Sequence, residues 1–174
     1  MTDYSTSMRT DRCGDLRVDD VGRQVTLCGW VGRREHGEHL AFIDLRDRSG
    51  VVQLVVDGAH DLRSEYVLQV SGTVRERPAD TANDSLVTGA VEIDAVEVTV
   101  LAAAEPPPFP IDERTDVDEM LRLKHRYVDL RRPRMQRNLE VRARVNSAVR
   151  GAMEEQGFVE VETPMLIAST PEGA

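Results

Sequence analysis

The chain has 174 residues, of which 40% are apolar and 30% are charged, and its formal net charge at pH 7 is −9. A chain of this length can form one complete small domain and part of a second. No apolar run approaches the roughly 18 to 20 residues that span a bilayer, and the polar start is no signal peptide, so a soluble protein is expected.

Residues 24–104 show the alternation of apolar and polar side chains that is typical of short β-strands. The segment Arg48-Ser49-Gly50 separates two of these strands and predicts a tight hairpin connection. The apolar residues of the first three strands, which we expect on the inner side, are Val25, Leu27, Val31, Ala41, Ile43, Leu45, Val52, Leu54 and Val56.

A short segment at 59–65 allows a helix, and two further strands are predicted at 66–77 and 91–101. Five strands with a small helix between the third and the fourth are the arrangement of an OB-fold barrel, whose face binds oligonucleotides. The alternation alone predicts a mainly β fold and leaves open another small barrel or a sandwich.

A proline-rich segment, Glu105-Pro106-Pro107-Pro108-Phe109-Pro110, follows the strands. Each proline fixes φ and disfavours helix in the preceding residue, so this segment should be a stiff, extended linker. The predicted organisation is therefore a β domain over 1–104, a linker or hinge over 105–121, and a second domain that begins at 122 and continues to 174.

An amphipathic helix is predicted from about Arg134 to Gln156, with Gly157 as its C-terminal cap. A short strand around Val159 and Val161 should follow and should end before Pro164. The apolar face of the helix carries Val141, Val145, Ala148, Val149, Ala152 and Met153.

Charge is distributed unevenly along the chain. The window 121–150 holds ten of the 22 basic residues and two acidic ones, a net charge of +8, which leaves −17 on the remainder. Such a segment suggests a surface that faces a polyanion, since neutralised phosphates release counterions. An arginine-rich helix face exposed to solvent would explain the same pattern.

Cysteine and histidine are sparse. Cys13 and Cys28 stand fifteen residues apart without a second pair, which favours free thiols in a reducing compartment over a disulfide or a metal site. His36 and His39 have a spacing that a metal could use, but no cysteine or carboxylate cluster accompanies them, so no metal site is predicted.

Three outward positions on the predicted strands could contact a nucleic acid. Phe42 is out of phase with Ala41 and Ile43, so its ring should project outward, where stacking on a base is worth about 1 to 3 kcal/mol. Gln53 and Glu92 are out of phase in the same way on neighbouring strands, and an amide and a carboxylate can both recognise base edges. A surface phenylalanine that packs on a partner, or lies there by chance, would give the same pattern.

Four segments carry a resemblance to a known family: TLCGW at 26–30, FIDLRDRSGVVQ at 42–53, RLKHRYVDLRRPRMQRNL at 122–139, and FVEVETPMLIASTPEGA at 158–174. Together they resemble the N-terminal third of bacterial aspartyl-tRNA synthetases, over a span from about Met8 to Ala174. The resemblance implies an anticodon-binding OB-fold domain, a hinge, and the helix and strand that begin a class II catalytic domain. Its VETP segment corresponds to the first of three class II signature motifs, which builds the family's dimer interface and here includes Val159, Val161 and Pro164.

The resemblance also implies roles for single residues. The family's aromatic residue that stacks on the middle anticodon base corresponds to Phe42, and the glutamine that bonds to this base corresponds to Gln53. A glutamate that recognises a neighbouring anticodon base corresponds to Glu92. Further anticodon and phosphate contacts correspond to Arg33, Arg34, Arg77 and Asn83.

The sequence departs from the family pattern after the first strand. The family has three arginines and then a glycine-containing turn, whereas this chain has Glu35 after Arg33 and Arg34. Either a carboxylate replaces a phosphate-binding arginine, or the loop is shifted by one residue. Near the end of the chain, Glu172 corresponds to the glutamate of the family's mobile loop, which approaches the amino group of bound aspartate.

The complete enzyme implied by the resemblance is an aspartate–tRNA ligase, which uses ATP and Mg²⁺, acts as a cytoplasmic homodimer, and charges tRNA(Asp) and in some bacteria also tRNA(Asn). The two other signature motifs, which hold ATP, are not in these 174 residues. We therefore expect this chain alone to be inactive and to bind neither ATP nor Mg²⁺ well.

Two alternatives remain open from the sequence. The chain could be a stand-alone, non-catalytic paralogue that binds tRNA or another RNA through its barrel. It could also be a structural protein that pairs with a full-length synthetase through the helix of its first signature motif.

Overall fold

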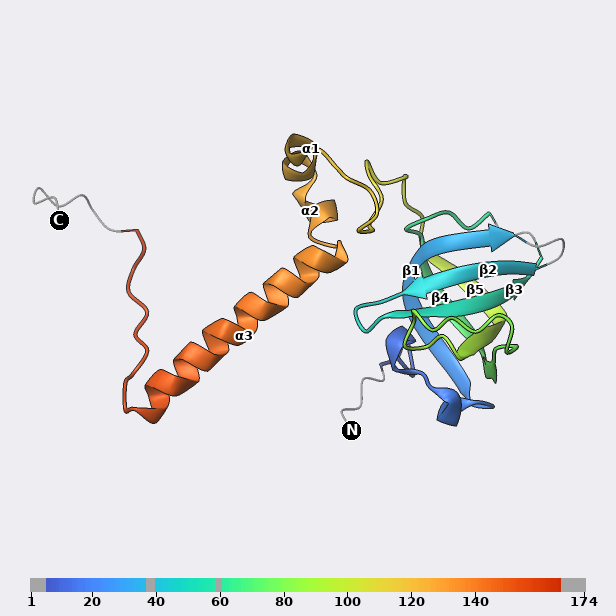
Figure 1. Cartoon of the computed structure of the whole chain (residues 1–174), viewed down its shortest axis with the longest axis horizontal. Coiled ribbons are helices and arrows are strands. Elements are labelled where there is room, and N and C mark those ends of the chain that lie inside the picture. Colours follow the sequence, from blue (N-terminus) through green and yellow to red (C-terminus); the bar gives the residue numbers. More distant parts are fainter. Residues whose placement is uncertain (1–5, 37–39, 59–60, 167–174) are drawn as a thin grey trace, which may run out of the picture. The chain divides into compact units, whose positions relative to one another are not determined.

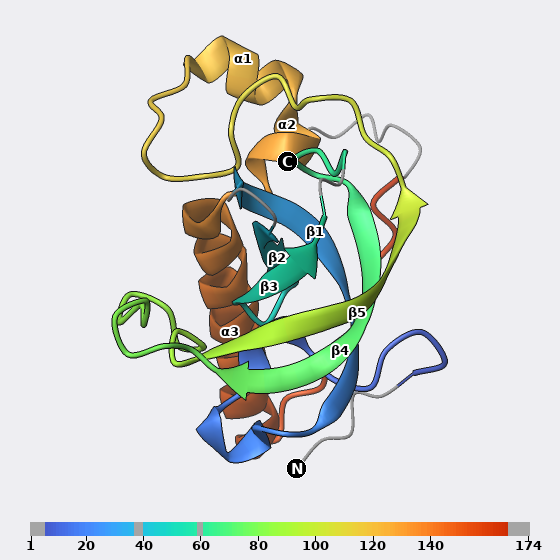
Figure 2. The same ribbon diagram turned by 90° about the vertical axis from the view of Figure 1, so that its right-hand side faces the viewer.

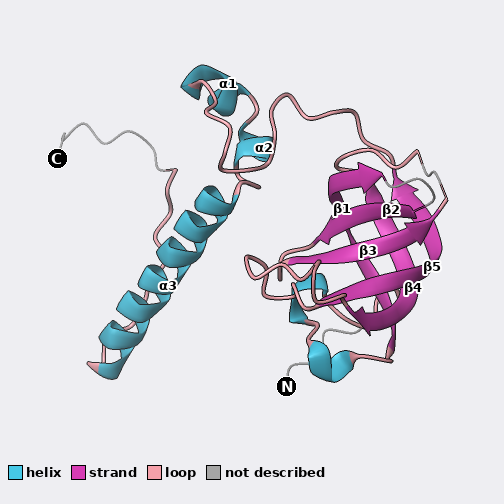
Figure 3. Cartoon of the chain, turned by 45° about the vertical axis from the view of Figure 1, so that its right-hand side comes forward, coloured by secondary structure: helices cyan, strands magenta, loops and turns pink. Residues whose placement is uncertain are grey.

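The computed structural model describes residues 6–36, 40–58 and 61–166, without the side chains of Arg33, Arg34 and His36. The chain divides into two units, Met1–Pro107 and Pro108–Ala174. Within these described ranges, the strands all belong to the first unit and the α-helices all belong to the second (Figure 3).

The first unit is a closed barrel in which the strands follow one another in the order β1-β2-β3-β5-β4 (Figure 1). β3 and β5 pair in parallel, whereas every other pair is antiparallel; Figure 2 shows β4 and β5 running side by side. The predicted mainly β fold with an OB-type barrel is confirmed. The elements of this unit are two 3-10 helices, η1 (Cys13–Asp15) and η2 (Val18–Asp20), and the strands β1 (Gln24–His36), β2 (Leu40–Arg46), β3 (Val51–Asp57), β4 (Val67–Glu76) and β5 (Val91–Ala102).

The interior of the barrel is filled by the apolar residues that alternate along its strands. All nine residues predicted on the inner side of the first three strands are at most 3% exposed, which confirms the predicted phase. Burying a side chain of valine, leucine or isoleucine size stabilises a fold by about 1.5 to 3 kcal/mol. Because successive side chains of a strand point to opposite faces, this core also determines which residues lie on the outer surface.

The connection between β2 and β3 is the tight hairpin that the sequence predicts. The Asp47 carboxylate accepts hydrogen bonds from the backbone N–H groups of Ser49, at 2.7 Å, and Cys13, at 3.0 Å. The N–H of Gly14 donates to Ser49 Oγ at 2.7 Å, so η1 is attached to the hairpin. A Cβ at position 14 would lie 2.2 Å from the carbonyl oxygen of Ser49, and only glycine allows this approach.

The helix expected at 59–65 does not form in its described part, 61–65, while residues 59 and 60 lie outside the described residues. The segment turns instead, with the N–H of Glu65 donating to the carbonyl of Val31 at 2.7 Å. Glu65 has a φ of 68°, and both oxygens of its buried carboxylate accept hydrogen bonds from Arg46 Nη2, each at 2.9 Å. A left-handed residue fixed in this way ends any right-handed helix.

The second unit contains the helices α1 (Glu119–Lys124), α2 (Arg126–Asp129) and α3 (Pro133–Glu155). Asp118 caps α1, since its Oδ1 accepts from the N–H groups of Met120 and Leu121 at 3.0 and 3.2 Å. α3 begins with a proline, which is favoured in the first turn, and lies within one residue of the predicted span. Gly157 follows α3 with a φ of 85°, as expected for a C-terminal cap.

The strand predicted around Val159 and Val161 is absent. Residues 158–166 contain no strand, and no described strand pairs with them. The side chains of Val159 and Val161 are 83% and 74% exposed. An alternating sequence becomes a strand only when a neighbour accepts its backbone hydrogen bonds, and no described part of this chain does so.

None of the described helices combines the length and the apolar character needed to cross a membrane.

Candidate nucleic-acid interface

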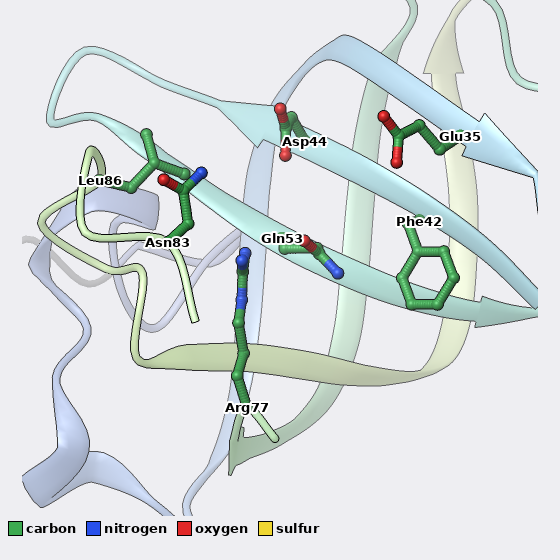
Figure 4. A pocket seen from close by; sticks show the side chains of 7 residues that line it. All are labelled: Glu35, Phe42, Asp44, Gln53, Arg77, Asn83 and Leu86. Atoms are coloured by element: carbon green, nitrogen blue, oxygen red, sulfur yellow. The ribbon is translucent and has the colours of Figure 1, made fainter. Parts of the chain in front are cut away.

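A small pocket of about 70 Å³ opens on the outer surface of the barrel (Figure 4). Four of the residues that the sequence analysis selected meet there, from two strands and from the segment between β4 and β5. The side chains that line the pocket are Glu35, Phe42, Asp44, Gln53, Arg77, Asn83 and Leu86.

Strand alternation and strand register place the first part of this site. Ile43 is fully buried, so its neighbours Phe42 and Asp44 face outward, and both are half-buried. Asp44 lies opposite Gln53 in the β2–β3 pair, and Phe42 lies opposite Glu35 in the β1–β2 pair. An aromatic face, an amide and two carboxylates are therefore brought together on three adjacent strands.

Arg77 forms the other side of the pocket and is only 6% exposed. Its Nε donates to the carbonyl of Val91 at 3.2 Å and its Nη1 to the carbonyl of Thr81 at 3.4 Å. Its Nη2 is buried without a hydrogen-bond partner among the described residues. Figure 4 shows this guanidinium extending between Asn83 and Gln53.

Glu92 differs from expectation because its carboxylate is covered. It lies next to Gln53 across the parallel β3–β5 pair, as predicted for neighbouring strands, yet it is only 4% exposed and does not line the pocket. Its Oε1 accepts from Arg75 Nε at 2.8 Å, and its Oε2 accepts from Gln53 Nε2 at 3.4 Å. In this structure Glu92 contacts other side chains of the barrel and is shielded from solvent.

The remaining site predictions fall partly outside the described residues. Arg33 and Arg34 belong to β1, at a register shift between Val31 and Arg34, but their side chains are not described. Glu35, the departure from the family pattern, is exposed in the pocket wall. Glu172 lies outside the described residues.

Sequence reasoning did not select Asp44, Leu86 or Arg75 as site residues. Asp44 and Arg75 both carry a usable signal, because each is polar and adjacent to a buried residue of its strand. Leu86 lies in an irregular segment, where no periodicity indicates which way a side chain points.

Part of the basic segment has an internal partner. The fully buried Asp129 carboxylate accepts hydrogen bonds from Arg122 Nε at 2.8 Å and Arg126 Nη1 at 2.6 Å, and Arg132 Nη1 lies 3.9 Å away. The hydrogen bond from Arg122 lowers the pKa of the Asp129 carboxyl below its usual value, with further lowering by the three positive charges. These three arginines therefore stabilise the second unit. Because their positive charges already face a carboxylate within the unit, they do not by themselves indicate a surface that binds nucleic acid.

The cysteines are free thiols, of which Cys13 is buried and Cys28 half-buried. Burial raises the pKa of both thiols, so neither is activated as a nucleophile. Within the described residues, no three metal-binding side chains gather in one place.

Two family models match the chain. The model described as an OB-fold nucleic acid binding domain matches residues 25–101, which include the core residues of all five strands and the strand residues of the pocket. The model described as tRNA synthetases class II (D, K and N) matches residues 118–174.

Curated relatives match nearly the whole chain. The aspartate–tRNA(Asp/Asn) ligase of Pseudarthrobacter chlorophenolicus is 52% identical over 170 residues, which is 96% of this chain and 28% of that protein. The ligase of the same name from Heliobacterium modesticaldum is 50% identical over 184 residues, which is all of this chain and 30% of that protein. The chain thus spans about 30% of the length of the curated relatives it matches.

Solved structures share the fold. The asparaginyl-tRNA synthetase of Pyrococcus horikoshii, complexed with asparaginyl-adenylate, matches with a TM-score of 0.76 and 25% identity, over 94% of this chain and 38% of that chain. The aspartyl-tRNA synthetase of Entamoeba histolytica matches with a TM-score of 0.82 over 96% of this chain and 41% of that one. At 19% identity, the second likeness concerns the fold alone.

Proposed function

Since this chain belongs to the aspartate–tRNA ligase family of class II aminoacyl-tRNA synthetases, we propose that its barrel binds the anticodon loop of tRNA(Asp). The names of its curated relatives support extending the proposal to tRNA(Asn). In this proposal the pocket receives an unstacked anticodon base, with Phe42 as the stacking surface and Gln53 as the residue that bonds to its edge.

One observation carries this proposal: Phe42, Gln53, Arg77 and Asn83 line a single pocket on the outer face of the barrel. Single-stranded bases are recognised by stacking on an aromatic ring together with hydrogen bonds to their edges. Phe42 can supply the first interaction, while the Gln53 amide, which carries both a donor and an acceptor, can supply the second. Arg33 and Arg34 on β1 are proposed as phosphate contacts, because arginine pairs well with phosphate.

The complete protein is proposed to attach aspartate to tRNA at the expense of ATP, with Mg²⁺ as cofactor, as a homodimer in the cytoplasm. Its dimer interface would include Val159, Val161 and Pro164, and Glu172 would approach the aspartate. The described residues contain no group of side chains suited to Mg²⁺, and we assign no step of aspartate activation to them. Their role is to bind tRNA and to begin the catalytic domain.

A stand-alone RNA-binding paralogue is not favoured. The similarity to ligases continues beyond the barrel and covers 96% of the chain, and the synthetase model matches residues 118–174. A protein that needed the barrel alone would not require this second stretch.

A binding experiment tests the proposal. The 174-residue chain is titrated against a labelled stem–loop with the anticodon of tRNA(Asp), the same stem–loop with the anticodon of tRNA(Asn), and one with all anticodon bases changed. Base recognition should make the first clearly tighter than the third at the same salt concentration, since phosphate contacts are the same in all three. Equal affinity for all three would reject anticodon recognition.

A further inference from the structure

Glu92 is a carboxylate with little access to water, on the outer layer of a barrel. A buried carboxylate is costly unless a cation and hydrogen bonds compensate it. Arg75, on the neighbouring strand β4, directly opposes Glu92 in the β4–β5 register and donates its Nε to Glu92 Oε1 at 2.8 Å. The Arg75 Nη1 also lies 3.6 Å from Asp94, so its side chain is held between two carboxylates of β5.

The other oxygen of Glu92 faces Gln53, whose Nε2 donates to it at 3.4 Å. Because a carboxylate only accepts hydrogen bonds, this contact requires the amide of Gln53 to direct its NH₂ group towards Glu92. The carbonyl oxygen of Gln53 is then left to accept from another donor, and Gln53 is one of the residues that line the pocket. Glu92 thus determines which edge of the amide accepts and which edge donates.

Arg75 is the only described cation that an ion pair joins to Glu92, and it is not among the residues that line the pocket. Without it, the Glu92 carboxylate would turn to solvent or take up a proton. In either case the Gln53 amide could rotate by half a turn, which exchanges its donor and its acceptor at nearly the same positions. In some of the molecules, the pocket would then present the donor and the acceptor of Gln53 in exchanged positions to the incoming base.

We propose that Arg75 is a positioning residue for anticodon recognition: through Glu92 it fixes the donor and acceptor pattern that Gln53 presents to the bound base. This inference rests on the proposed function of the pocket. Arg75 acts on base selectivity and makes no contact with phosphate. Its side chain is 42% exposed, so its substitution opens no cavity in the core, and the lost ion pair is relieved when the Glu92 carboxylate turns to solvent or takes up a proton.

The test compares the full chain with Arg75→Gln and Arg75→Lys. Binding is measured to the anticodon stem–loop of tRNA(Asp) and to versions with one anticodon base changed. Arg75→Gln should lower the preference for the correct base about tenfold, the size of one lost directional contact, with an unchanged salt slope. Arg75→Lys, which keeps a charge but not the planar donor, should restore part of the preference. Arg63→Gln, at a 60% exposed arginine paired with Asp61 outside the pocket, is the matched control and should behave as the parent.

A second measurement reports on the network without RNA. The side-chain amide resonances of Gln53 should shift in Arg75→Gln and in Glu92→Gln, and the double variant should lose no more base preference than Glu92→Gln alone.

Three results would count against the inference in different ways. If the parent chain shows no base preference, the proposed function fails. If the parent discriminates and Arg75→Gln does so equally well, Arg75 does not position the site. If Arg75→Gln lowers the salt slope by about one unit, Arg75 contacts phosphate directly and the positioning role is rejected.

Discussion

At the scale of single residues, Phe42 is half-buried on the outer face of β2 and lines the pocket. It lies opposite the pocket residue Glu35 on β1 and opposite Val55 on β3. In the proposed function its ring is the surface on which an anticodon base stacks.

Phe42→Ala should therefore weaken binding to the anticodon stem–loop by about 1 to 3 kcal/mol and leave the salt slope nearly unchanged, because stacking releases no counterions. Fluorescence anisotropy at several salt concentrations measures both quantities. Tyr127→Ala is the control, since it removes an aromatic side chain that is 69% exposed in the second unit. Equal affinity of Phe42→Ala and the parent would remove the stacking role.

Asp129 contributes to the pH dependence of stability of the second unit. Its pKa is lowered in the folded state, chiefly by the hydrogen bond from Arg122, so its contribution to stability is present above the unfolded pKa near 4 and is lost as the pH falls through the lower folded pKa. Asp129→Asn should reduce hydrogen-exchange protection around α2 at neutral pH by about 1.5 to 3 kcal/mol. The difference from the parent should vanish at acid pH; a constant difference would show that charge is not the cause.

The residues of the site were predictable from sequence to different degrees. Phe42 and Gln53 follow from strand phase, because each alternates with residues that the core must bury. The burial of Glu92 does not follow, because it depends on which long side chain of a neighbouring strand covers it. That neighbour, Arg75, is known only once the β4–β5 register is known.

At the scale of elements, η1 can attach to the β2–β3 hairpin only because residue 14 is a glycine, which has no Cβ. Gly14→Ala would place a Cβ 2.2 Å from the carbonyl oxygen of Ser49 and 2.6 Å from the backbone nitrogen of Gly50. Backbone atoms in a hairpin cannot move aside as a flexible side chain can. The clash therefore separates η1 from the barrel or distorts the hairpin.

We expect Gly14→Ala to lower the free energy of unfolding of the barrel by roughly 1 to 3 kcal/mol. Urea denaturation followed by the fluorescence of the single tryptophan, Trp30 on β1, reports on this unit. Gly151→Ala, in α3, is the control, because its added Cβ meets no atom within 4 Å. An unchanged midpoint for Gly14→Ala would mean that η1 is not part of the barrel's cooperative unit.

Elements were predictable where local sequence dominates. The hairpin at Arg48–Gly50 and the limits of α3 depend on turn residues, a proline and a glycine cap, all of which act locally. The expected strand at Val159 and Val161 was wrong because a strand needs a partner, which no local pattern reveals. The expected helix at 59–65 was wrong in its described part: Glu65 has a left-handed φ, and its contacts with Arg46 and with the carbonyl of Val31 are long-range, so no local pattern reveals them.

At the scale of the whole molecule, the two units differ in how much apolar surface they bury. The barrel has a filled interior, whereas no residue of α3 is buried. Val141, Val145 and Val149 are between 54% and 58% exposed, and burial of such side chains would be worth about 1.5 to 3 kcal/mol each. The second unit in isolation should therefore be either easily unfolded or prone to associate.

Limited proteolysis should yield a resistant core that ends near Glu105, with early cleavage in the irregular segment that contains the exposed Arg114. Sedimentation of the uncut chain should show either a monomer whose second unit is cleaved readily or oligomers that form through α3. A fully protected, strictly monomeric chain would show that the second unit has a core of its own, and would favour a self-sufficient paralogue.

The chain alone should give no ATP–pyrophosphate exchange with aspartate above background. It spans about 30% of the length of its ligase relatives, and the charge on a transferring phosphoryl group needs preorganised partners that these residues do not assemble. The exchange assay is run beside a complete ligase as positive control. Exchange that is abolished by Glu172→Ala would overturn this expectation.

The parallel pairing of β3 with β5 has a consequence for the order in which the protein matures during translation. β3 ends at Asp57, yet its parallel partner β5 begins only at Val91, and β1 pairs not only with β2 but also with β4, which begins at Val67. Until the ribosome has released residues up to about Ala102, the nascent chain carries open strand edges, which invite aggregation. The barrel, and with it the pocket on its outer face, is therefore completed only when the last strand is added.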